Sequence, residues 1–145
     1  LDMSKLNEEN HELLDLLHYL EKKEQSVVVI FSDNVESLKA IEQIVKEVKE
    51  DVQTFIATRE SILMRDLKKQ TPTTFLINPQ IRGVNVEKLL STIKYMYSNL
   101  DIGFICESLT KDVLLLAKKF KISMIIQPND TKENQKKRIE VLLEQ

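Results

Sequence analysis

The stretch Thr73–Asn85, TTFLINPQIRGVN, decides the fold that this sequence predicts. Its first five residues follow Pro72 and are β-branched or apolar, a pattern typical of a strand buried on both faces. The run ends at Asn78, and a loop with Pro79 and Gly83 follows. Residues 86–100 then place apolar side chains at helical spacing. A buried strand, a loop and an amphipathic helix form the repeating unit of a parallel sheet.

The same unit occurs five times along the chain. We predict strands at 26–31, 52–57, 73–77, 101–106 and 122–126, and helices at 35–50, 60–69, 86–100, 110–120 and 131–145. We expect Asp130 to cap the last helix, with Glu133 three residues further on. The alternation predicts a doubly wound α/β domain with a five-stranded parallel sheet and helices on both faces.

An amphipathic helix is predicted ahead of the sheet, over residues 5–24. Its apolar stripe follows a heptad spacing together with Asn10, but two heptads are too few to establish a coiled coil. The stripe comprises Leu6, Leu13, Leu17 and Leu20. We therefore divide the chain into an N-terminal amphipathic helix, 1–25, and an α/β domain, 26–145. The stripe is covered either in a homodimer or by packing on the domain itself.

Composition excludes several classes of function. The net charge of −2 gives no global attraction to nucleic acid or to an anionic membrane, and no apolar run approaches the ~18 residues of a spanning helix. Cys106 is the only cysteine, which indicates a reducing cytoplasm and no disulfide. His11 and His18 share a helix face without a third ligand nearby, so we expect no metal site. Nucleotide-binding glycine motifs are absent, and we expect no cofactor.

Polar residues follow the predicted strands at the point where each one ends. In a doubly wound sheet, ligands bind at this carboxyl edge. The candidate residues there are Ser32, Asp33, Asn78, Cys106, Gln127 and Pro128.

These five units resemble the receiver domain of two-component response regulators, over residues 26–145. The segment NPQIRGVNVEKLL, 78–90, fits the loop after the receiver's phosphoacceptor strand without a gap, and IIQPN, 125–129, fits its Lys-Pro ending. The resemblance implies a flavodoxin-like sheet with strand order 2-1-3-4-5. It also implies an output and dimer face over 109–145, which includes Met124. The consecutive leucines Leu114, Leu115 and Leu116 lie there too, and not all three can point inward.

The resemblance extends to the frame of the site and not to its chemistry. The receiver's acidic pair becomes Ser32 and Asp33, its phosphoacceptor Asp becomes Asn78, its hydroxyl residue becomes Cys106, and its lysine becomes Gln127, while Pro128 is kept. An amide oxygen cannot form an acyl phosphate. One carboxylate makes a poor Mg²⁺ site. A neutral Gln127 cannot balance the charge of a transferring phosphoryl group.

The sequence thus predicts a non-catalytic pseudo-receiver that binds protein partners in bacterial signal transduction, independently of phosphorylation. Its expected interaction residues are Leu6, Leu13, Leu17, Leu20, Leu114, Leu115 and Met124. One alternative is a ligand or redox sensor that uses the pocket around Asp33, Asn78 and Cys106. Another is an enzyme of unrecognised type on a flavodoxin-like sheet.

Overall fold

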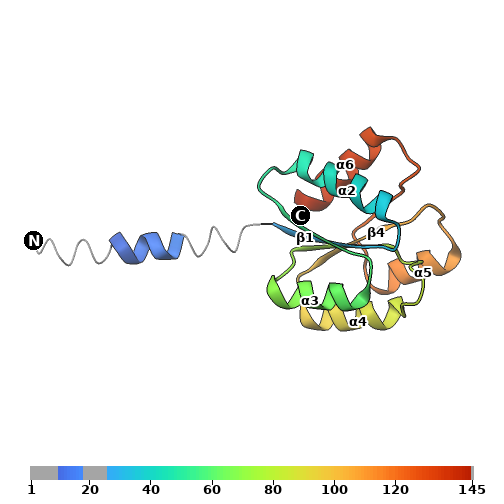
Figure 1. The fold of residues 1–145 in the computed structure, drawn as a ribbon, viewed down its shortest axis with the longest axis horizontal. Coiled ribbons are helices and arrows are strands. Elements are labelled where there is room, and N and C mark those ends of the chain that lie inside the picture. The colour runs from blue at the N-terminus through green and yellow to red at the C-terminus, as the bar shows by residue number, and fades with distance from the viewer. Residues whose placement is uncertain (1–9, 18–25, 145) are drawn as a thin grey trace, which may run out of the picture.

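The computed structural model describes residues 10–17 and 26–144, and it confirms the predicted α/β fold (Figure 1). Five parallel strands form one sheet in the order β2-β1-β3-β4-β5. The strands are β1 (Val27–Phe31), β2 (Gln53–Ala57), β3 (Thr74–Ile77), β4 (Asp101–Ile105) and β5 (Met124–Ile126). The helices between them are α2 (Val35–Val48), α3 (Glu60–Lys69), α4 (Val86–Met96), α5 (Lys111–Lys119) and α6 (Lys132–Glu144).

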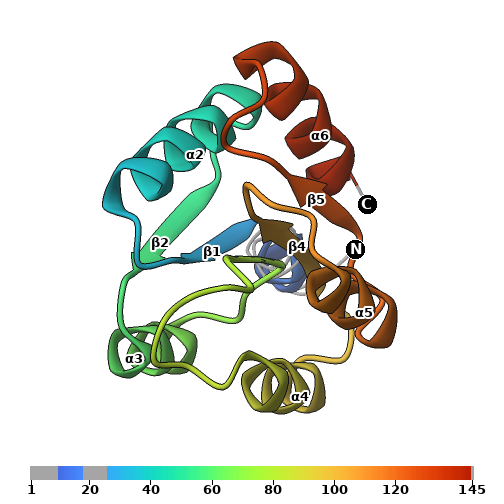
Figure 2. The ribbon, with the colours of Figure 1, turned by 90° about the vertical axis from the view of Figure 1, so that its right-hand side faces the viewer.

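Helices cover both faces of the sheet. Figure 2 shows α2 and α6 on one face and α3, α4 and α5 on the other. Because successive strand residues point to opposite faces, β1 contributes to two separate cores. Val28 and Ile30 pack with buried residues of α2 and α6, whereas Val29 and Phe31 pack with buried residues of α3, α4 and α5. The uninterrupted apolar run of β1 follows from this double burial.

Side chains that cap the helix N-termini allow the loops to be built with few glycines. The side-chain oxygens of Asn34, Asn85 and Thr110 accept hydrogen bonds from backbone N–H groups in the first turns of α2, α4 and α5. Each bond satisfies a donor that the helix itself leaves unpaired. These caps fix where each helix starts at the carboxyl edge of the sheet.

Two sequence expectations about helix ends are wrong. Helix α4 ends at Met96 and not at residue 100, because Tyr97 leaves the helical conformation and its hydroxyl donates to the Leu67 carbonyl at 3.0 Å. Helix α6 is capped by Thr131, whose hydroxyl accepts from the Asn134 N–H at 3.2 Å. Asp130 instead accepts from the Thr131 N–H at 2.8 Å and from the Asn134 side-chain amide at 3.0 Å.

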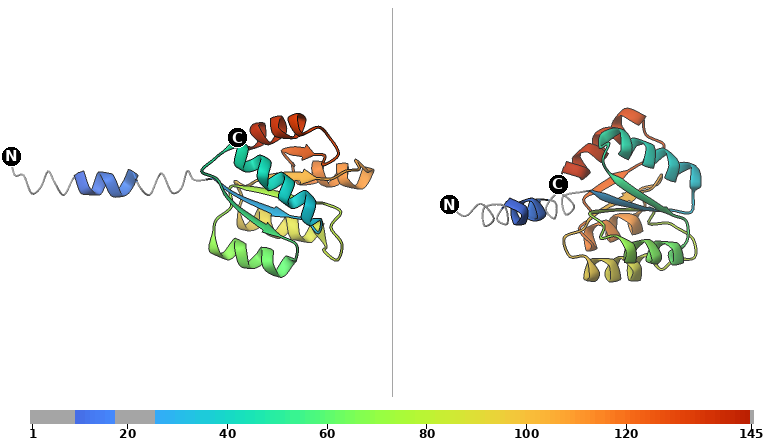
Figure 3. Two further views of the ribbon diagram at one scale, coloured as in Figure 1. Left: turned by 45° about the horizontal axis from the view of Figure 1, so that its top comes forward. Right: turned by 60° about the vertical axis from the view of Figure 1, so that its left-hand side comes forward.

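Part of the predicted leading helix is present. Residues 10–17 are helical, and all eight are exposed (Figures 1 and 3). The rest of the predicted helix, including Leu6 and Leu20, lies outside the described residues. Over 10–17 and 26–144, none of the helices has both the length and the apolar character needed to cross a membrane.

Gly83 adopts the left-handed backbone conformation in the loop between β3 and α4. It has φ of +76°, and a Cβ placed there would meet nothing within 4 Å. A Gly83→Ala substitution therefore tests backbone conformation alone, and we expect it to lower the free energy of unfolding by about 1–2 kcal/mol, the cost of the left-handed region for an L-residue. Urea unfolding measures this. Gly83→Asn serves as the control, because asparagine tolerates the left-handed region and should cost less. Equal losses for both variants would contradict the explanation.

Candidate functional site at the carboxyl ends of the strands

The loops that follow β1, β3, β4 and β5 line one cavity that is open to solvent. Its volume is about 570 Å³. Five of the six residues predicted for the site line this cavity: Ser32, Asp33, Asn78, Cys106 and Pro128. The strand order explains why they meet, since β1 lies beside β3 and β3 beside β4. Residues far apart in the chain thus share one edge of the sheet.

Asn78 is held by the loop that it begins. Its backbone N–H donates to the Phe31 carbonyl at 2.9 Å, which continues the β1–β3 ladder past the end of the strand. Its side-chain Oδ1 accepts from the Gln80 N–H at 2.9 Å. This is the Asx-type turn that asparagine favours. The side-chain amide oxygen of Asn78 is therefore engaged in the structure of the loop.

The β1 end provides one buried hydroxyl and one exposed carboxylate. Ser32 is buried, and its Oγ accepts from the Asn34 N–H at 3.2 Å. Asp33 is exposed on the rim of the cavity. Within 10–17 and 26–144, no group of three or more His, Cys, Asp or Glu side chains is placed to hold a metal ion. The described side chains thus supply one carboxylate at this strand end where a Mg²⁺ site favours several.

Cys106 lies at the end of β4 and is buried at 3% exposure. Its backbone N–H donates to the Ile126 carbonyl at 3.1 Å, which ties it to β5. Burial raises the pKa of the Cys106 thiol. Because the thiolate is the reactive form, this environment opposes nucleophilic or redox chemistry at neutral pH.

Gln127 and Pro128 connect the end of β5 to its surroundings. The Gln127 side-chain amide donates to the Glu107 carbonyl at 3.1 Å, so it holds the loop between β4 and α5 and does not line the cavity. The Pro128 carbonyl accepts from the buried Gln135 side chain at 3.2 Å. Gln127 is therefore a neutral tether between two loops.

Eight residues outside the predicted set also line the cavity. They are Asn34, Val35, Ser37, Gln80, Arg82, Ile105, Glu107 and Ser108. Arg82 brings a cation to the cavity from the β3–α4 loop. Arg82 lies in the segment 78–90, which fits the receiver loop, and this position could have marked it as a candidate. The direction of an exposed loop side chain, however, is set by the fold and not by spacing.

The predicted interaction residues of the described chain lie on exposed or partly exposed surfaces. Leu13 and Leu17 are on the 10–17 helix, and Leu114 and Leu115 are on α5. Of the nine residues of α5, only Val113 is buried, so the expectation that the three consecutive leucines cannot all point inward is confirmed. Met124 on the edge strand β5 is partly buried, and its Sδ lies 3.8 Å from the Arg138 guanidinium.

The fold is that of response-regulator receiver domains. A response regulator from Thermotoga maritima superposes with a TM-score of 0.72 at 11% identity, over 83% of this chain and 99% of that one. The receiver domain of a DNA-binding response regulator (merR) from Colwellia psychrerythraea 34H gives 0.72 at 16% identity, over 83% and 100%. A putative pilus assembly protein (cpaE) from Burkholderia thailandensis E264 gives 0.67 at 9% identity, over 83% and 100%.

Sequence comparisons add no family. No family model matches the chain, and no curated protein matches it. The solved structures share the strand order and the helical layers at identities that establish the fold alone. The function must therefore be inferred from the residues at the carboxyl edge and on the surface.

Proposed function

We propose that this chain is a pseudo-receiver: a receiver-type domain that accepts no phosphoryl group and regulates signal transduction by binding protein partners. The observation that carries the proposal is Asn78. By its resemblance to the receiver pattern it stands at the phosphoacceptor position, and its side-chain oxygen accepts a hydrogen bond from the Gln80 N–H. Phosphorylation of a receiver requires a carboxylate nucleophile at this position, and the amide of Asn78 cannot replace it.

The neighbouring positions support the same conclusion. Ser32 and Gln127 replace an acid and a lysine, and both make hydrogen bonds that hold loops together. Asp33 is left as the single carboxylate of the former acidic pair. A phosphoryl transfer site needs a nucleophile, a metal and a compensating cation together. Here the carboxylate nucleophile is missing and the acidic pair is reduced to one carboxylate, while Arg82 is the cation that lines the cavity in place of the lysine. We infer that the chain is not an enzyme and that its function resides on its surfaces.

The test is the transfer of a phosphoryl group from a small donor. After incubation with acetyl phosphate and Mg²⁺, we expect the intact mass of the protein to be unchanged, because no carboxylate lies at the end of β3. A working receiver domain, treated in parallel, serves as the positive control. Stable addition of one phosphoryl group to an acidic side chain of this protein would contradict the proposal.

Exposed apolar side chains support a binding role. Leu109, Leu114 and Leu115 are exposed around α5, and Leu13 and Leu17 are exposed on the 10–17 helix. Apolar side chains grouped on one surface mark a contact site, whereas single ones are normal. A protein partner and a homodimer both fit these surfaces. The single cysteine is consistent with a reducing, cytoplasmic setting.

A ligand sensor is the second candidate, and the cavity of about 570 Å³ favours it. Its volume lies within the range of small-molecule sites, which run from roughly 300 to 1,000 Å³. Its lining is mostly polar, whereas such sites are mostly apolar with a few polar groups. The cavity is therefore a weaker argument than the substituted phosphoacceptor.

The redox form of this candidate makes a separate prediction about Cys106. Because the thiol is buried and its pKa is raised, we expect a thiol reagent such as DTNB to modify native protein at least about 100-fold more slowly than protein unfolded in urea. After oxidant treatment, the Cys106→Ser variant and the wild type should show the same oligomeric state. Rapid modification of the native protein, or an oxidant response that the serine variant lacks, would favour the redox sensor.

A further inference from the structure

Two apolar surfaces of this chain face solvent in the described structure. One is the 10–17 helix, whose leucines Leu13, Leu14, Leu16 and Leu17 are 50–62% exposed. The other is the outer side of α5, which we call the α5 surface and define as residues 109–121. On it Leu109, Leu114 and Leu115 are 48–54% exposed. Among the described residues, neither surface has an apolar cover.

The apolar arc of the 10–17 helix is too wide for a two-stranded coiled coil. At 100° per residue its four leucines cover about 160° of the helix circumference. A coiled-coil seam uses only the a and d positions, which are Leu13 and Leu17 in the heptad spacing. Leu14 and Leu16 flank that seam at the e and g positions, which a two-stranded coiled coil covers only in part. A broader apolar surface would cover all four.

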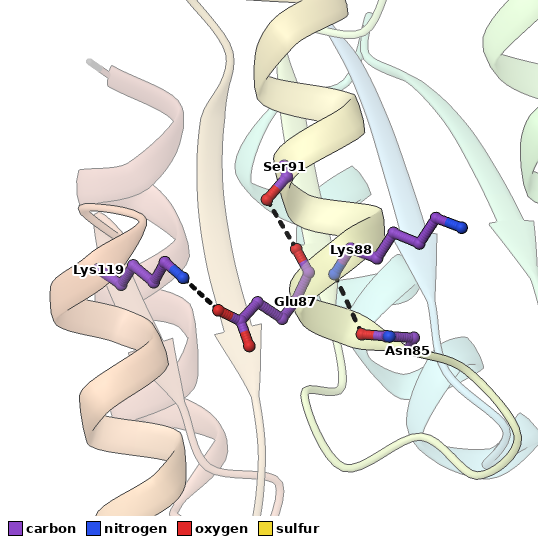
Figure 4. Close-up of polar contacts among 5 residues, drawn as sticks. All are labelled: Asn85, Glu87, Lys88, Ser91 and Lys119. Carbon is purple, nitrogen blue, oxygen red and sulfur yellow. Dashed lines mark hydrogen bonds and ion pairs between the residues drawn. The ribbon is translucent and has the colours of Figure 1, made fainter.

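The α5 surface offers a hollow of suitable character. The hollow lies between α4 and α5 and measures about 480 Å³. Its lining is mixed: the apolar part includes Val84, Val86, Leu115 and Leu116, and the polar part is Asn85, Glu87, Asp112 and Lys119. At its rim Lys119 of α5 forms an ion pair with Glu87 of α4 (Figure 4). The same figure shows Asn85 and Ser91 bonding within the first turns of α4, which fixes this wall of the hollow. Leucine side chains fit the apolar part of this lining.

The charges of the two surfaces are complementary. Residues 10–17 contain Glu12 and Asp15 and neither lysine nor arginine, which gives a net charge of −2 with histidine neutral. Residues 109–121 contain four lysines and one aspartate, which gives +3. Glu87 offsets one of these lysines. Opposite charges around an apolar contact favour its formation and set its orientation.

We propose that the 10–17 helix of one copy binds the α5 surface of a second copy, and that the second copy returns the same contact. The proposal deepens the binding role inferred above and rests on it. All eight residues of the 10–17 helix are exposed in the described structure, and in this arrangement the second copy covers its leucines. A reciprocal exchange forms two identical contacts related by a two-fold axis, and it closes at the dimer.

Two variants and their mixture test this arrangement by sedimentation. The helix variant carries Leu13→Glu and Leu17→Glu, and the surface variant carries Leu114→Glu and Leu115→Glu. All four side chains are exposed, so both variants should fold, which circular dichroism checks. We expect a wild-type dimer and two monomeric variants, each with a dissociation constant raised at least about 100-fold. Tyr95→Glu, at a 92% exposed position on α4, is the control and should remain dimeric.

The mixture of the two variants is the decisive sample. The intact helix of the surface variant can bind the intact α5 surface of the helix variant, so we expect a heterodimer held by one of the two contacts. A coiled coil would leave the surface variant dimeric, and a dimer through α5 alone would leave the helix variant dimeric. Either result overturns the proposal, as does a monomeric wild type, which would place the helix on its own domain or on another protein.

A second pair of variants covers the case in which the surface variant fails to fold. Lys111→Glu with Lys118→Glu changes only exposed side chains of α5, and it should also weaken the dimer, while Glu12→Lys with Asp15→Lys should restore binding to it. Lack of restoration would overturn the charge assignment and with it the proposal. None of these results depends on phosphorylation. The reciprocal helix contact can therefore be disproved while the pseudo-receiver proposal stands, and the pseudo-receiver proposal can be disproved while the helix contact stands.

Discussion

Phe75→Ala is expected to lower the free energy of unfolding by about 3–5 kcal/mol, the range for removing a buried phenylalanine. Phe75 lies on β3 at the centre of the sheet, with 0% exposure. It pairs with Val29 of β1 and Ile102 of β4, and it belongs to the core that α3, α4 and α5 cover. Its loss leaves a cavity that neighbours fixed in two strand ladders cannot fill.

Phe55 provides a matched control for this prediction. It is opposite Val29 from the other side, on the edge strand β2, and is only partly buried. We expect Phe55→Ala to cost about 1–2 kcal/mol, because part of the ring already contacts water. Urea unfolding of both variants measures the difference. Similar losses of unfolding free energy for Phe75→Ala and Phe55→Ala would show that the sheet is not packed most tightly at its centre.

Gly103→Val is expected to lower the free energy of unfolding by about 1–3 kcal/mol through overpacking. Gly103 lies in the middle of β4, and a Cβ placed there would come within 2.8 Å of Leu76 Cδ2 and 3.1 Å of Leu142 Cδ2. The absence of a side chain lets α6 approach the sheet. Alanine should cost less than valine, because the ends of two leucine side chains can shift.

A double-mutant cycle checks the cause of this effect. In a Leu142→Ala background the added methyl group of Gly103→Ala meets one fewer neighbour, so its cost should fall. The measurement is again the free energy of unfolding in urea. An unchanged cost in this background would contradict the packing explanation and would point to the backbone of β4.

The fold could be predicted from the sequence because its signals are local. The β-branched runs of β1 and β3 and the helical spacing of α3 gave these elements within one residue of their observed bounds. The end of α4 could not be predicted, because a tertiary hydrogen bond from the Tyr97 hydroxyl to the Leu67 carbonyl stabilises the turn after Met96. Propensity carries no information about such a contact.

The sequence predicted five of the residues that lie at the candidate site, but it did not predict the hydrogen bonds that their side chains make. Ser32, Asn78 and Cys106 directly follow β1, β3 and β4, and they share one edge because parallel strands bring their carboxyl ends together. The bond from Gln80 to Asn78 and the tether from Gln127 to Glu107 depend on the path of the loops. Leu14 and Leu16 were missed because a heptad template selects only the seam positions.

The proposal that this domain accepts no phosphoryl group is tested most directly by intact-mass measurement of Asn78→Asp beside the wild type, after incubation with acetyl phosphate and Mg²⁺. We expect no added mass on either protein, because the introduced carboxylate would still lack a full acidic pair for Mg²⁺ at the end of β1 and a lysine in place of Gln127. Addition to the variant alone would limit the defect to Asn78. Stable addition of one phosphoryl group to the wild type would contradict the pseudo-receiver assignment.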